Sequence, residues 1–257
     1  MVVSQVANYW DDEPCHFWAG KNYETGSKEF FEAIESERYS SQDYIHKFAQ
    51  FSRWHKKDVL EVGCGIGTDA LQFIRSGAYY QGIDLSSYSI DIAKKRIDLY
   101  GLSPAYDPQF TVMNAENILY EDKSFDLVYS WGVIHHSPNP EKVVDEIYRV
   151  LRPNGKFVGM IYKRFSTMGL AVYLRDIARH YNPFISLTTA FKRSLESPGT
   201  KAYNIGEAKK LFGKFSDLKI SYAFTPELNG LKNTPFLSLL KYYPNSLASW
   251  LVIEGVK

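Results

Sequence analysis

The sequence has little cysteine, no excess of charge of one sign and no long run of apolar residues. Cys15 and Cys64 are its only cysteines, which gives neither a disulfide framework nor a cluster of metal ligands. Lys and Arg total 30 against 29 for Asp and Glu, so no net field would draw the protein to nucleic acid or to an anionic membrane. The longest apolar stretches, such as 247–253, fall well short of the roughly 18 residues that a membrane-spanning helix needs.

The N-terminus also lacks the basic segment followed by an apolar segment that marks a secretion signal, and instead carries three successive acids at 11–13. These absences together predict a soluble cytoplasmic protein with no bound metal, no nucleic-acid partner and no membrane partner.

Aromatic residues are abundant, at 16% of the chain, and they concentrate at its two ends. Residues 1–55 combine these aromatics with helical spacing, Ser27 is placed to cap one of the helices, and we predict a helical lid there. Residues 56–162 alternate short apolar strands with helices. We predict strands at 59–62, 79–84, 110–113, 125–130 and 156–162. Such alternation implies parallel βαβ units and a doubly wound α/β sheet.

This alternation stops after residue 162. Residues 163–203 contain an amphipathic run and a Ser-Pro-Gly turn at 197–199, which predict an inserted helical cap over a substrate. Residues 204–257 return to the core, with a helix at 204–212 and two closing strands at 218–224 and 248–256. The predicted sheet therefore has seven strands.

The most informative motif is a set of three glycines at alternate positions, Gly63, Gly65 and Gly67, directly after the predicted strand 59–62. Glycines there let the chain turn sharply and bring backbone amides against a ligand. A tight strand-to-helix turn would use the same glycines, so the motif alone is ambiguous. Asp84 ends the next predicted strand, where a carboxylate can accept both ribose hydroxyls. Together these residues predict a nucleoside site at the carboxyl ends of parallel strands.

Two further strand ends lie beside this site. Asn114 and Ala115 follow the third predicted strand, and the Asn114 amide oxygen can accept from the exocyclic amine of adenine. A turn-forming Asn is the alternative interpretation. A dinucleotide would also fit the glycines and the acid, but it requires a second mononucleotide-binding half, and the sequence after residue 162 shows none.

Four ordered motifs then make the interpretation specific: VLEVGCGIGT at 59–68, GIDLS at 82–86, SFDLV at 124–128 and VLRPNGK at 150–156. They resemble class I methyltransferases that use S-adenosylmethionine, in the small-molecule branch that includes the ubiquinone/menaquinone-type enzymes. The resemblance implies a mostly parallel seven-stranded sheet with an antiparallel last strand, and S-adenosylhomocysteine as the product.

The resemblance also implies roles for individual residues. The methionine end of the cofactor would contact Glu61, Gly63, Cys64, Gly65 and Gly67. The ribose would contact Asp84 and Leu85, and the adenine would lie between Asn114 and Ala115. Ser130 would line the floor of the cofactor site. One departure is visible, because the position that reads the adenine edge is often Asp in this family and is Asn here.

Candidate catalytic residues follow the fourth predicted strand. His135 and His136 lie in a loop that borders the methyl donor in this family, and a neutral imidazole is a suitable base near neutral pH. The alternative is that one His packs under the next helix while the other binds a loop carbonyl. We expect Trp18, Tyr23, Tyr39 and Trp131 to line the acceptor site. Arg38 is placed either to reach a carboxylate or to be a solvated surface residue.

These observations predict an enzyme that moves a methyl group to an O or N atom of a small molecule. We expect this reaction to belong to secondary metabolism. The lids would enclose a pocket, which disfavours the alternative of a protein or RNA methyltransferase. A non-catalytic module that only binds S-adenosylmethionine is the remaining alternative. We expect a monomer or a homodimer.

Overall fold

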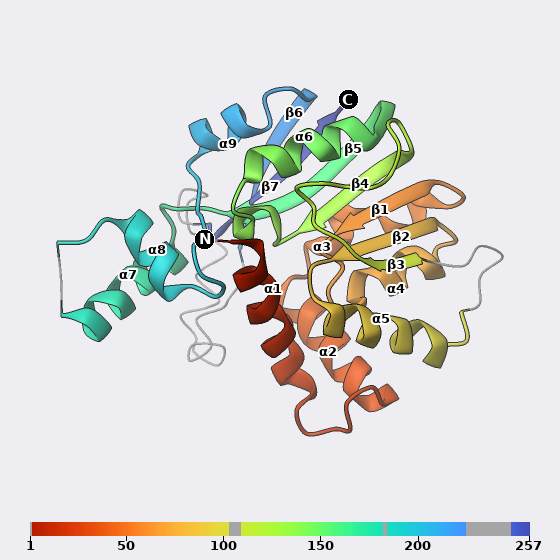
Figure 1. The fold of residues 1–257 in the computed structure, drawn as a ribbon, viewed down its shortest axis with the longest axis horizontal. Coiled ribbons are helices and arrows are strands. Elements are labelled where there is room, and N and C mark those ends of the chain that lie inside the picture. The colour runs from red at the N-terminus through yellow and green to blue at the C-terminus, as the bar shows by residue number, and fades with distance from the viewer. Residues whose placement is uncertain (1, 103–108, 182–183, 225–247) are drawn as a thin grey trace.

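The computed structural model describes residues 2–102, 109–181, 184–224 and 248–257. At its centre is a seven-stranded sheet in the order β3-β2-β1-β4-β5-β7-β6 (Figure 1). The strands are β1 (Asp58–Val62), β2 (Tyr79–Asp84), β3 (Gln109–Val112), β4 (Phe125–Trp131), β5 (Leu151–Tyr162), β6 (Ser216–Ala223) and β7 (Trp250–Val256). Strands β1 to β5 pair in parallel, whereas β7 runs antiparallel to both β5 and β6. The predicted doubly wound sheet with an antiparallel last strand is confirmed.

Helices cover both faces of this sheet. Alternate side chains of a strand point to opposite faces, so Val59 joins one apolar cluster and Leu60 joins the other. The first cluster includes residues of α3 (Ile45–Ala49), α4 (Thr68–Arg75) and α5 (Ser87–Leu99). The second includes residues of α6 (Pro140–Val150) and α9 (Ile205–Leu211). Both Val59 and Leu60 are fully buried, as expected for strands covered on two sides.

The N-terminal segment forms α1 (Val3–Asp12), a 3-10 turn η1 (Phe17–Gly20), α2 (Lys28–Ser41) and, after α3, a second 3-10 turn η2 (Phe51–Trp54). Ser27 caps α2 as predicted, because its Oγ accepts a hydrogen bond of 3.1 Å from the Phe30 amide. Tyr44, Ile45, Phe48 and Phe51 have the apolar spacing of one continuous helix. Gln50 instead adopts a left-handed conformation, with φ 47°, and separates α3 from η2.

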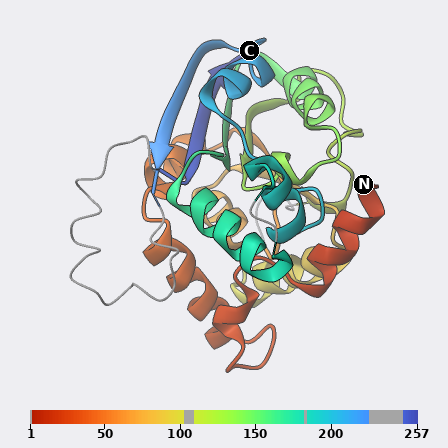
Figure 2. The same cartoon turned by 90° about the vertical axis from the view of Figure 1, so that its left-hand side faces the viewer.

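The segment 163–203 forms α7 (Thr167–His180) and α8 (Leu187–Ser194), which pack against each other away from the sheet (Figure 1). In Figure 2 these two helices face the viewer and α1 lies beside them. Helices are thus present where a helical cap was predicted, while the domain boundaries and the capping role remain predictions. None of the described helices is long and apolar enough to cross a membrane.

One strand begins earlier than predicted. The Pro153-Asn154-Gly155 turn was expected to precede a strand at 156–162, but β5 already pairs with β4 at Leu151. Asn154 takes a left-handed φ of 65° inside this strand, and the register with β4 shifts between Phe125 and Leu127. The turn residues therefore produce an irregularity within β5 instead of ending the pairing.

Candidate functional site

A cavity of about 760 Å³ opens at the carboxyl ends of β1, β2 and β4. Residues of the N-terminal segment form much of its wall, including Tyr9 and Trp10 of α1 and Arg38 of α2. One residue of the 163–203 segment, Glu196, also lines it. Its volume is within the range of small-molecule sites. The cavity therefore joins the predicted nucleoside site to the N-terminal helices and the cap segment.

The three glycines have different roles in the structure. Gly63 and Gly65 line the cavity, with positive φ values of 79° and 50°. A Cβ on Gly63 would be 2.2 Å from Cγ2 of Val133, whereas apart from Gly65 itself and its two chain neighbours no described residue has an atom within 4 Å of the Cβ position on Gly65. Gly67 is not part of the cavity wall, and a Cβ there would meet the Cβ of Ala93 in α5 at 3.1 Å. Gly67 thus allows helix packing, while Gly65 leaves space for a ligand.

Asp84 lies at the end of β2 and lines the cavity as predicted for a ribose ligand. Its Oδ2 accepts from the Gly65 amide at 2.8 Å, and its Oδ1 accepts from the Ser86 amide at 2.9 Å. Burial raises the pKa of this carboxyl, although the backbone amides partly oppose the shift. Each oxygen still has a lone pair with which to accept a hydroxyl proton. The carboxylate is held in place before any ribose binds.

Helix α1 is fastened beside this carboxylate. Asp11 accepts from the Ser86 hydroxyl at 2.6 Å and from the Tyr88 amide at 3.2 Å, both at the N-terminus of α5. At another point of the cavity wall, Trp10 packs edge-on against His136, with ring centroids 5.0 Å apart. The last turn of α1 therefore contacts both the N-terminus of α5 and the two-histidine loop.

Glu61 is buried at 3% exposure, and its Oε2 accepts a 2.6 Å hydrogen bond from the Tyr80 hydroxyl. Burial, followed by the charge of Asp69, raises the pKa of Glu61 well above its usual range. Burial likewise raises the pKa of the Cys64 thiol, with the Asp84 carboxylate adding to the shift. Both residues line the cavity, but Cys64 is not an activated thiolate.

Arg38 is not a solvated surface residue. It lines the cavity and makes a two-pronged ion pair with Asp69 of α4, in which Nε donates to Oδ1 at 2.8 Å and Nη2 donates to Oδ2. The hydroxyls of Tyr39 and Tyr129 also donate to Asp69, each at 2.9 Å. Among the described residues of the cavity wall, Arg38 is the only Lys or Arg. It supplies a fixed positive charge next to the glycine turn.

Asn114 and Ala115 line the cavity after β3, as expected for residues that flank adenine. The Asn114 amide oxygen accepts from the Glu116 amide at 2.9 Å, which is the turn-forming role named above as the alternative. Only its second lone pair is then left for an adenine amine. Glu116 in turn accepts from Ser137 Oγ at 2.6 Å and from Asn139 Nδ2 at 2.8 Å, which ties this turn to the loop after the two histidines.

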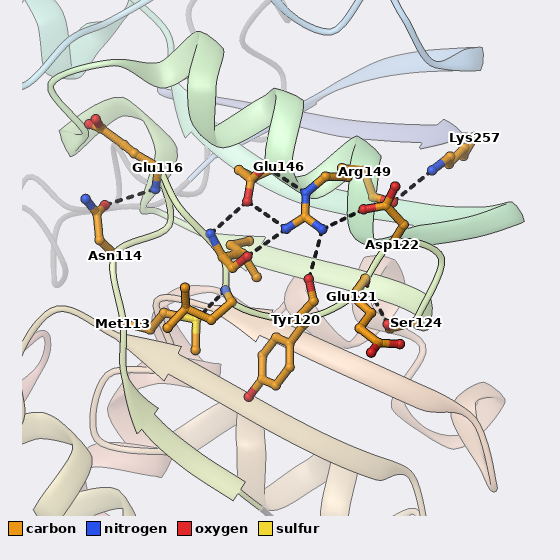
Figure 3. A network of polar contacts seen from close by, with 12 residues as sticks. Met113, Asn114, Glu116, Tyr120, Glu121, Asp122, Ser124, Glu146, Arg149 and Lys257 are labelled. Atoms are coloured by element: carbon orange, nitrogen blue, oxygen red, sulfur yellow. Dashed lines mark hydrogen bonds and ion pairs between the residues drawn. The ribbon is translucent and has the colours of Figure 1, made fainter.

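The segment that follows Asn114 is held by a polar network around Arg149 of α6 (Figure 3). The Arg149 guanidinium donates to the backbone carbonyls of Ile118 at 2.6 Å and Tyr120 at 2.9 Å, and to both oxygens of Glu146 at 2.8 Å. Glu146 also accepts from the Ile118 amide at 2.8 Å. This network fixes the path of the chain between β3 and β4 and thereby the position of Asn114.

Ser130 and Trp131 end β4 in different environments. Ser130 is fully buried, does not belong to the cavity wall, and donates to the Val62 carbonyl at 3.1 Å. Its predicted place on the cofactor floor therefore has no support in the structure, because the hydroxyl joins β4 to β1. Trp131 lines the cavity, and its Nε1 donates to Gln42 Oε1 at 2.9 Å.

The two neighbouring histidines are not equivalent. His135 is fully buried, is not part of the cavity wall, and stacks on Tyr162 with ring centroids 3.8 Å apart. Within the described residues neither of its ring nitrogens has a hydrogen-bond partner. Burial, with a smaller effect from His136, lowers the pKa of His135 well below its usual value. His135 is a buried packing residue outside the cavity wall, and no contact with the cavity supports its predicted catalytic role.

His136 lines the cavity, and polar groups surround its ring. Nδ1 lies 2.9 Å from Ser197 Oγ and 3.0 Å from Thr200 Oγ1, and Nε2 lies 3.2 Å from Glu196 Oε2. Glu196 Oε2 also accepts from the Tyr162 hydroxyl at 2.5 Å. His136 therefore has the geometry of a proton-handling residue, whereas His135 does not.

The predicted acceptor-site aromatics separate in the same way. Trp18 lines the cavity at 53% exposure, but Tyr23 is 49% exposed and Tyr39 donates to Asp69, and neither belongs to the wall. The sequence interpretation did not place Tyr162 or Glu196 at the site, and both line the cavity. Tyr162 ends a predicted strand and Glu196 precedes the Ser-Pro-Gly turn, so both stand at positions that the sequence analysis had noted. No sequence pattern, however, indicated that they contact the histidines.

The polar groups of the cavity wall match those of S-adenosylmethionine. Asp84 can accept from the ribose hydroxyls, the space at Gly65 allows the methionine part of the cofactor to lie against the backbone, and Arg38 can pair with the methionine carboxylate. Acids in the described part of the wall, among them Asp12, Glu13 and Glu37, suit the ammonium and the sulfonium. In the described part of the chain, no cluster of three His, Cys, Asp or Glu residues is arranged to hold a metal ion.

Comparison with known proteins agrees with this chemistry. Residues 60–159 match the family model described as "Methyltransferase domain". The fatty-acid O-methyltransferase of Mycolicibacterium smegmatis is 36% identical over 129 residues, which are 49% of this chain and 44% of that relative. This chain thus spans less than half the length of that relative.

Solved structures share the fold over nearly the whole chain. A phosphoethanolamine N-methyltransferase 2 of Haemonchus contortus, in complex with S-adenosylhomocysteine, has a TM-score of 0.62 at 18% identity, covering 98% of this chain and 60% of that one. The [4+2]-cyclase SpnF has a TM-score of 0.62 at 17% identity, covering 100% and 97%. The fold is thus shared with a protein named for another reaction, so the fold by itself does not show the activity. Residues 60–159 match a methyltransferase domain, as the motifs led us to expect for this part of the chain.

Proposed function

We propose that the protein transfers the methyl group of S-adenosylmethionine to an oxygen or nitrogen atom of a small molecule. The observation that carries this proposal is a single cavity in which Gly63, Gly65 and Asp84 lie at one end and His136 and Glu196 lie at the other. Residues suited to bind the methyl donor and residues suited to accept a proton therefore line the same cavity. The family match and the relative named for O-methylation support the same class of reaction.

The bound donor supplies an electrophilic methyl carbon on a sulfonium. The chain's task is to hold both reactants in line and dry, which contributes up to ~7 to 11 kcal/mol in favourable intramolecular cases. Asp84 would hold the ribose and Arg38 the methionine carboxylate, while Asn114 and Ala115 flank the adenine. Helix α1, fastened through Asp11, would exclude water from the cavity.

The acceptor would be small, because α1 and Glu196 enclose the cavity on the side opposite the sheet. Trp10, Trp18 and Trp131 give that end an aromatic wall. We also propose that the protein acts in the cytoplasm, in secondary metabolism. We propose that it is a monomer or a homodimer, without a nucleic-acid or membrane partner.

The test is a transfer assay with S-adenosylmethionine labelled in its methyl group, incubated with the protein and a metabolite extract. The expected result is a labelled small molecule and an equal amount of S-adenosylhomocysteine, identified by mass spectrometry. Affinity for the donor without any loss of label would indicate a module that binds S-adenosylmethionine without turnover. Tight binding of a nicotinamide dinucleotide instead of S-adenosylmethionine would contradict the site assignment itself.

A further inference from the structure

The 163–203 segment places the carboxylate of Glu196 against the loop that carries the two histidines. Its Oε2 lies 3.2 Å from His136 Nε2 and accepts from the Tyr162 hydroxyl at 2.5 Å. The side chain nevertheless keeps 35% of its surface exposed and lines the cavity. One oxygen is thus held by its neighbours while the carboxylate remains open to a ligand.

Two hydroxyls hold the ring of His136 in place. Nδ1 lies 2.9 Å from Ser197 Oγ and 3.0 Å from Thr200 Oγ1, and the Thr200 hydroxyl itself donates to the Ser197 carbonyl at 2.6 Å. Nε2 has no hydrogen-bond partner among the described residues, but it lies 3.2 Å from Glu196 Oε2. The two side chains are therefore close enough to form an ion pair whenever the imidazole is protonated.

Other ionisable groups around Glu196 bear on this pair. Burial opposes ionisation of Glu196, but hydrogen bonding and charge from His136, together with the Tyr162 hydroxyl and His16, outweigh it and lower the pKa of this carboxyl. Burial and the carboxylates of Glu196 and Glu13 raise the pKa of Tyr9 to about 12, so Tyr9 is not a competing base. Burial lowers the pKa of His16 to about 4, so that imidazole is neutral.

We propose that Glu196 accepts the proton that the acceptor releases on methylation, and that the acceptor is therefore an alcohol or phenol. The acceptor oxygen forms a bond to the methyl carbon, its O–H bond breaks, and the proton passes to the Glu196 carboxylate. The sulfur keeps the electron pair of the broken C–S bond and leaves as a neutral thioether. A positive sulfonium and a negative carboxylate thus become two neutral groups, so atoms and charges balance.

The other acceptor classes do not fit this carboxylate. A carboxylic acid is already ionised at neutral pH, needs no base, and would be repelled by Glu196 and the other acids of the wall. An amine held there would stay an ammonium ion without a lone pair, because a carboxylate is too weak a base to deprotonate it. A hydroxyl becomes strongly acidic only as its oxygen is methylated, at which point a weak base suffices. The inference rests on the proposed function and departs from the fatty-acid relative.

The test uses the full chain and two substitutions at one position. Glu196→Gln keeps the size of the side chain but cannot accept a proton, and Glu196→Asp retains the carboxylate. Glu29→Gln in the exposed first turn of α2 is the matched control for loss of one negative charge. We expect Glu196→Gln to lower kcat roughly 10²- to 10⁴-fold, with unchanged calorimetric affinity for S-adenosylhomocysteine and partial recovery in Glu196→Asp.

A readout that needs no acceptor is the ¹⁵N spectrum of histidine-labelled protein with S-adenosylhomocysteine. We expect the Nε2 signal of His136 to differ between the wild type and Glu196→Gln, because the substitution removes a charge that lies 3.2 Å from this nitrogen. Identical His136 signals in both proteins would contradict an interaction between the two side chains.

The chemical identity of the labelled product tests the proposed acceptor class. An ether supports the proposal, whereas a methyl ester, a methylated amine or a kcat that is unaffected by Glu196→Gln overturns it. If no label leaves the donor with wild-type protein, the proposed function itself has failed, and the spectrum still reports whether His136 and Glu196 form a pair.

Discussion

The two ends of the cavity are built in different ways. At the donor end, the ligand-facing groups lie at the ends of β1 and β2, where backbone pairing holds Gly63 and Asp84 at neighbouring positions of the sheet. At the acceptor end, Trp10, His136 and Glu196 come from three segments separated by at least 60 residues, and side-chain contacts bring them together. The donor end therefore depends on strand order, and the acceptor end on how helices pack over the sheet. Variants at the donor end should remove binding, and variants at the acceptor end should remove turnover alone.

The largest effect is expected for Asp84→Ala, which tests the donor end. Loss of the carboxylate removes two charge-assisted ribose hydrogen bonds and frees the amides of Gly65 and Ser86. We expect affinity for S-adenosylhomocysteine to fall at least about 100-fold by calorimetry. The exposed Asp91→Ala on the following helix is the control. Unchanged affinity in the Asp84 variant would mean that the nucleoside binds elsewhere.

The next largest effect concerns the two histidines. His136→Ala should lower turnover roughly 100-fold while donor affinity stays the same. His135→Ala should spare both quantities for folded protein, and should instead cost about 2 kcal/mol of the free energy of unfolding because it empties a buried site. Turnover with labelled donor and urea unfolding of both variants provide the measurement. Equal loss of turnover in the two variants would break the distinction drawn between them.

A smaller effect is expected for Arg149→Ala, which acts on the donor end from a distance. The variant leaves the Ile118 and Tyr120 carbonyls without their donor and Glu146 without its ion pair. We expect a loss of about 2 kcal/mol in the free energy of unfolding and weaker donor affinity. Lys257→Ala is the control: it removes a hydrogen bond to the Arg149 carbonyl and a cation–π contact with Tyr148, and should cost below about 0.5 kcal/mol. A stable variant with weakened binding would still support the positioning role, whereas no change in either quantity would contradict it.

The smallest effect is a pH dependence of stability that arises from Asp69 in the cavity wall. Burial opposes ionisation of Asp69, but Arg38 and the hydroxyls of Tyr39 and Tyr129 outweigh it and lower the pKa of this carboxyl. Its contribution to stability is then present above the unfolded pKa of about 3.9 and is lost as the pH falls through the lower folded pKa. The stability gap between the wild type and Asp69→Asn should therefore narrow below about pH 4, measured by urea unfolding. A constant gap across this range would show that Asp69 does not titrate as proposed.

Much of the donor end followed from the sequence. Apolar runs of four to six residues between helical segments predicted β1 to β4 closely, because a strand covered on two faces must be apolar throughout. The polar residues directly after those runs then had to gather at one edge of a parallel sheet. Gly63, Gly65, Asp84 and Asn114 line the cavity for that reason. The same logic failed for Ser130, because strand alternation alone does not show which neighbouring carbonyl a hydroxyl will reach.

The acceptor end was decided by tertiary structure. His135 and His136 are adjacent in sequence and chemically identical, yet the short 3-10 turn η3 (Ile134–His136) buries one ring against Tyr162 and directs the other toward Glu196. Arg38 and Tyr39 divide in the same manner, one lining the cavity and the other bonded beneath it. By itself, the sequence determined the sheet, the glycine turn and the nucleoside carboxylate, because local periodicity and strand order govern them. The ring of His135 depends on Tyr162, 27 residues away, and that of His136 on Glu196, 60 residues away, and only the tertiary packing sets those contacts.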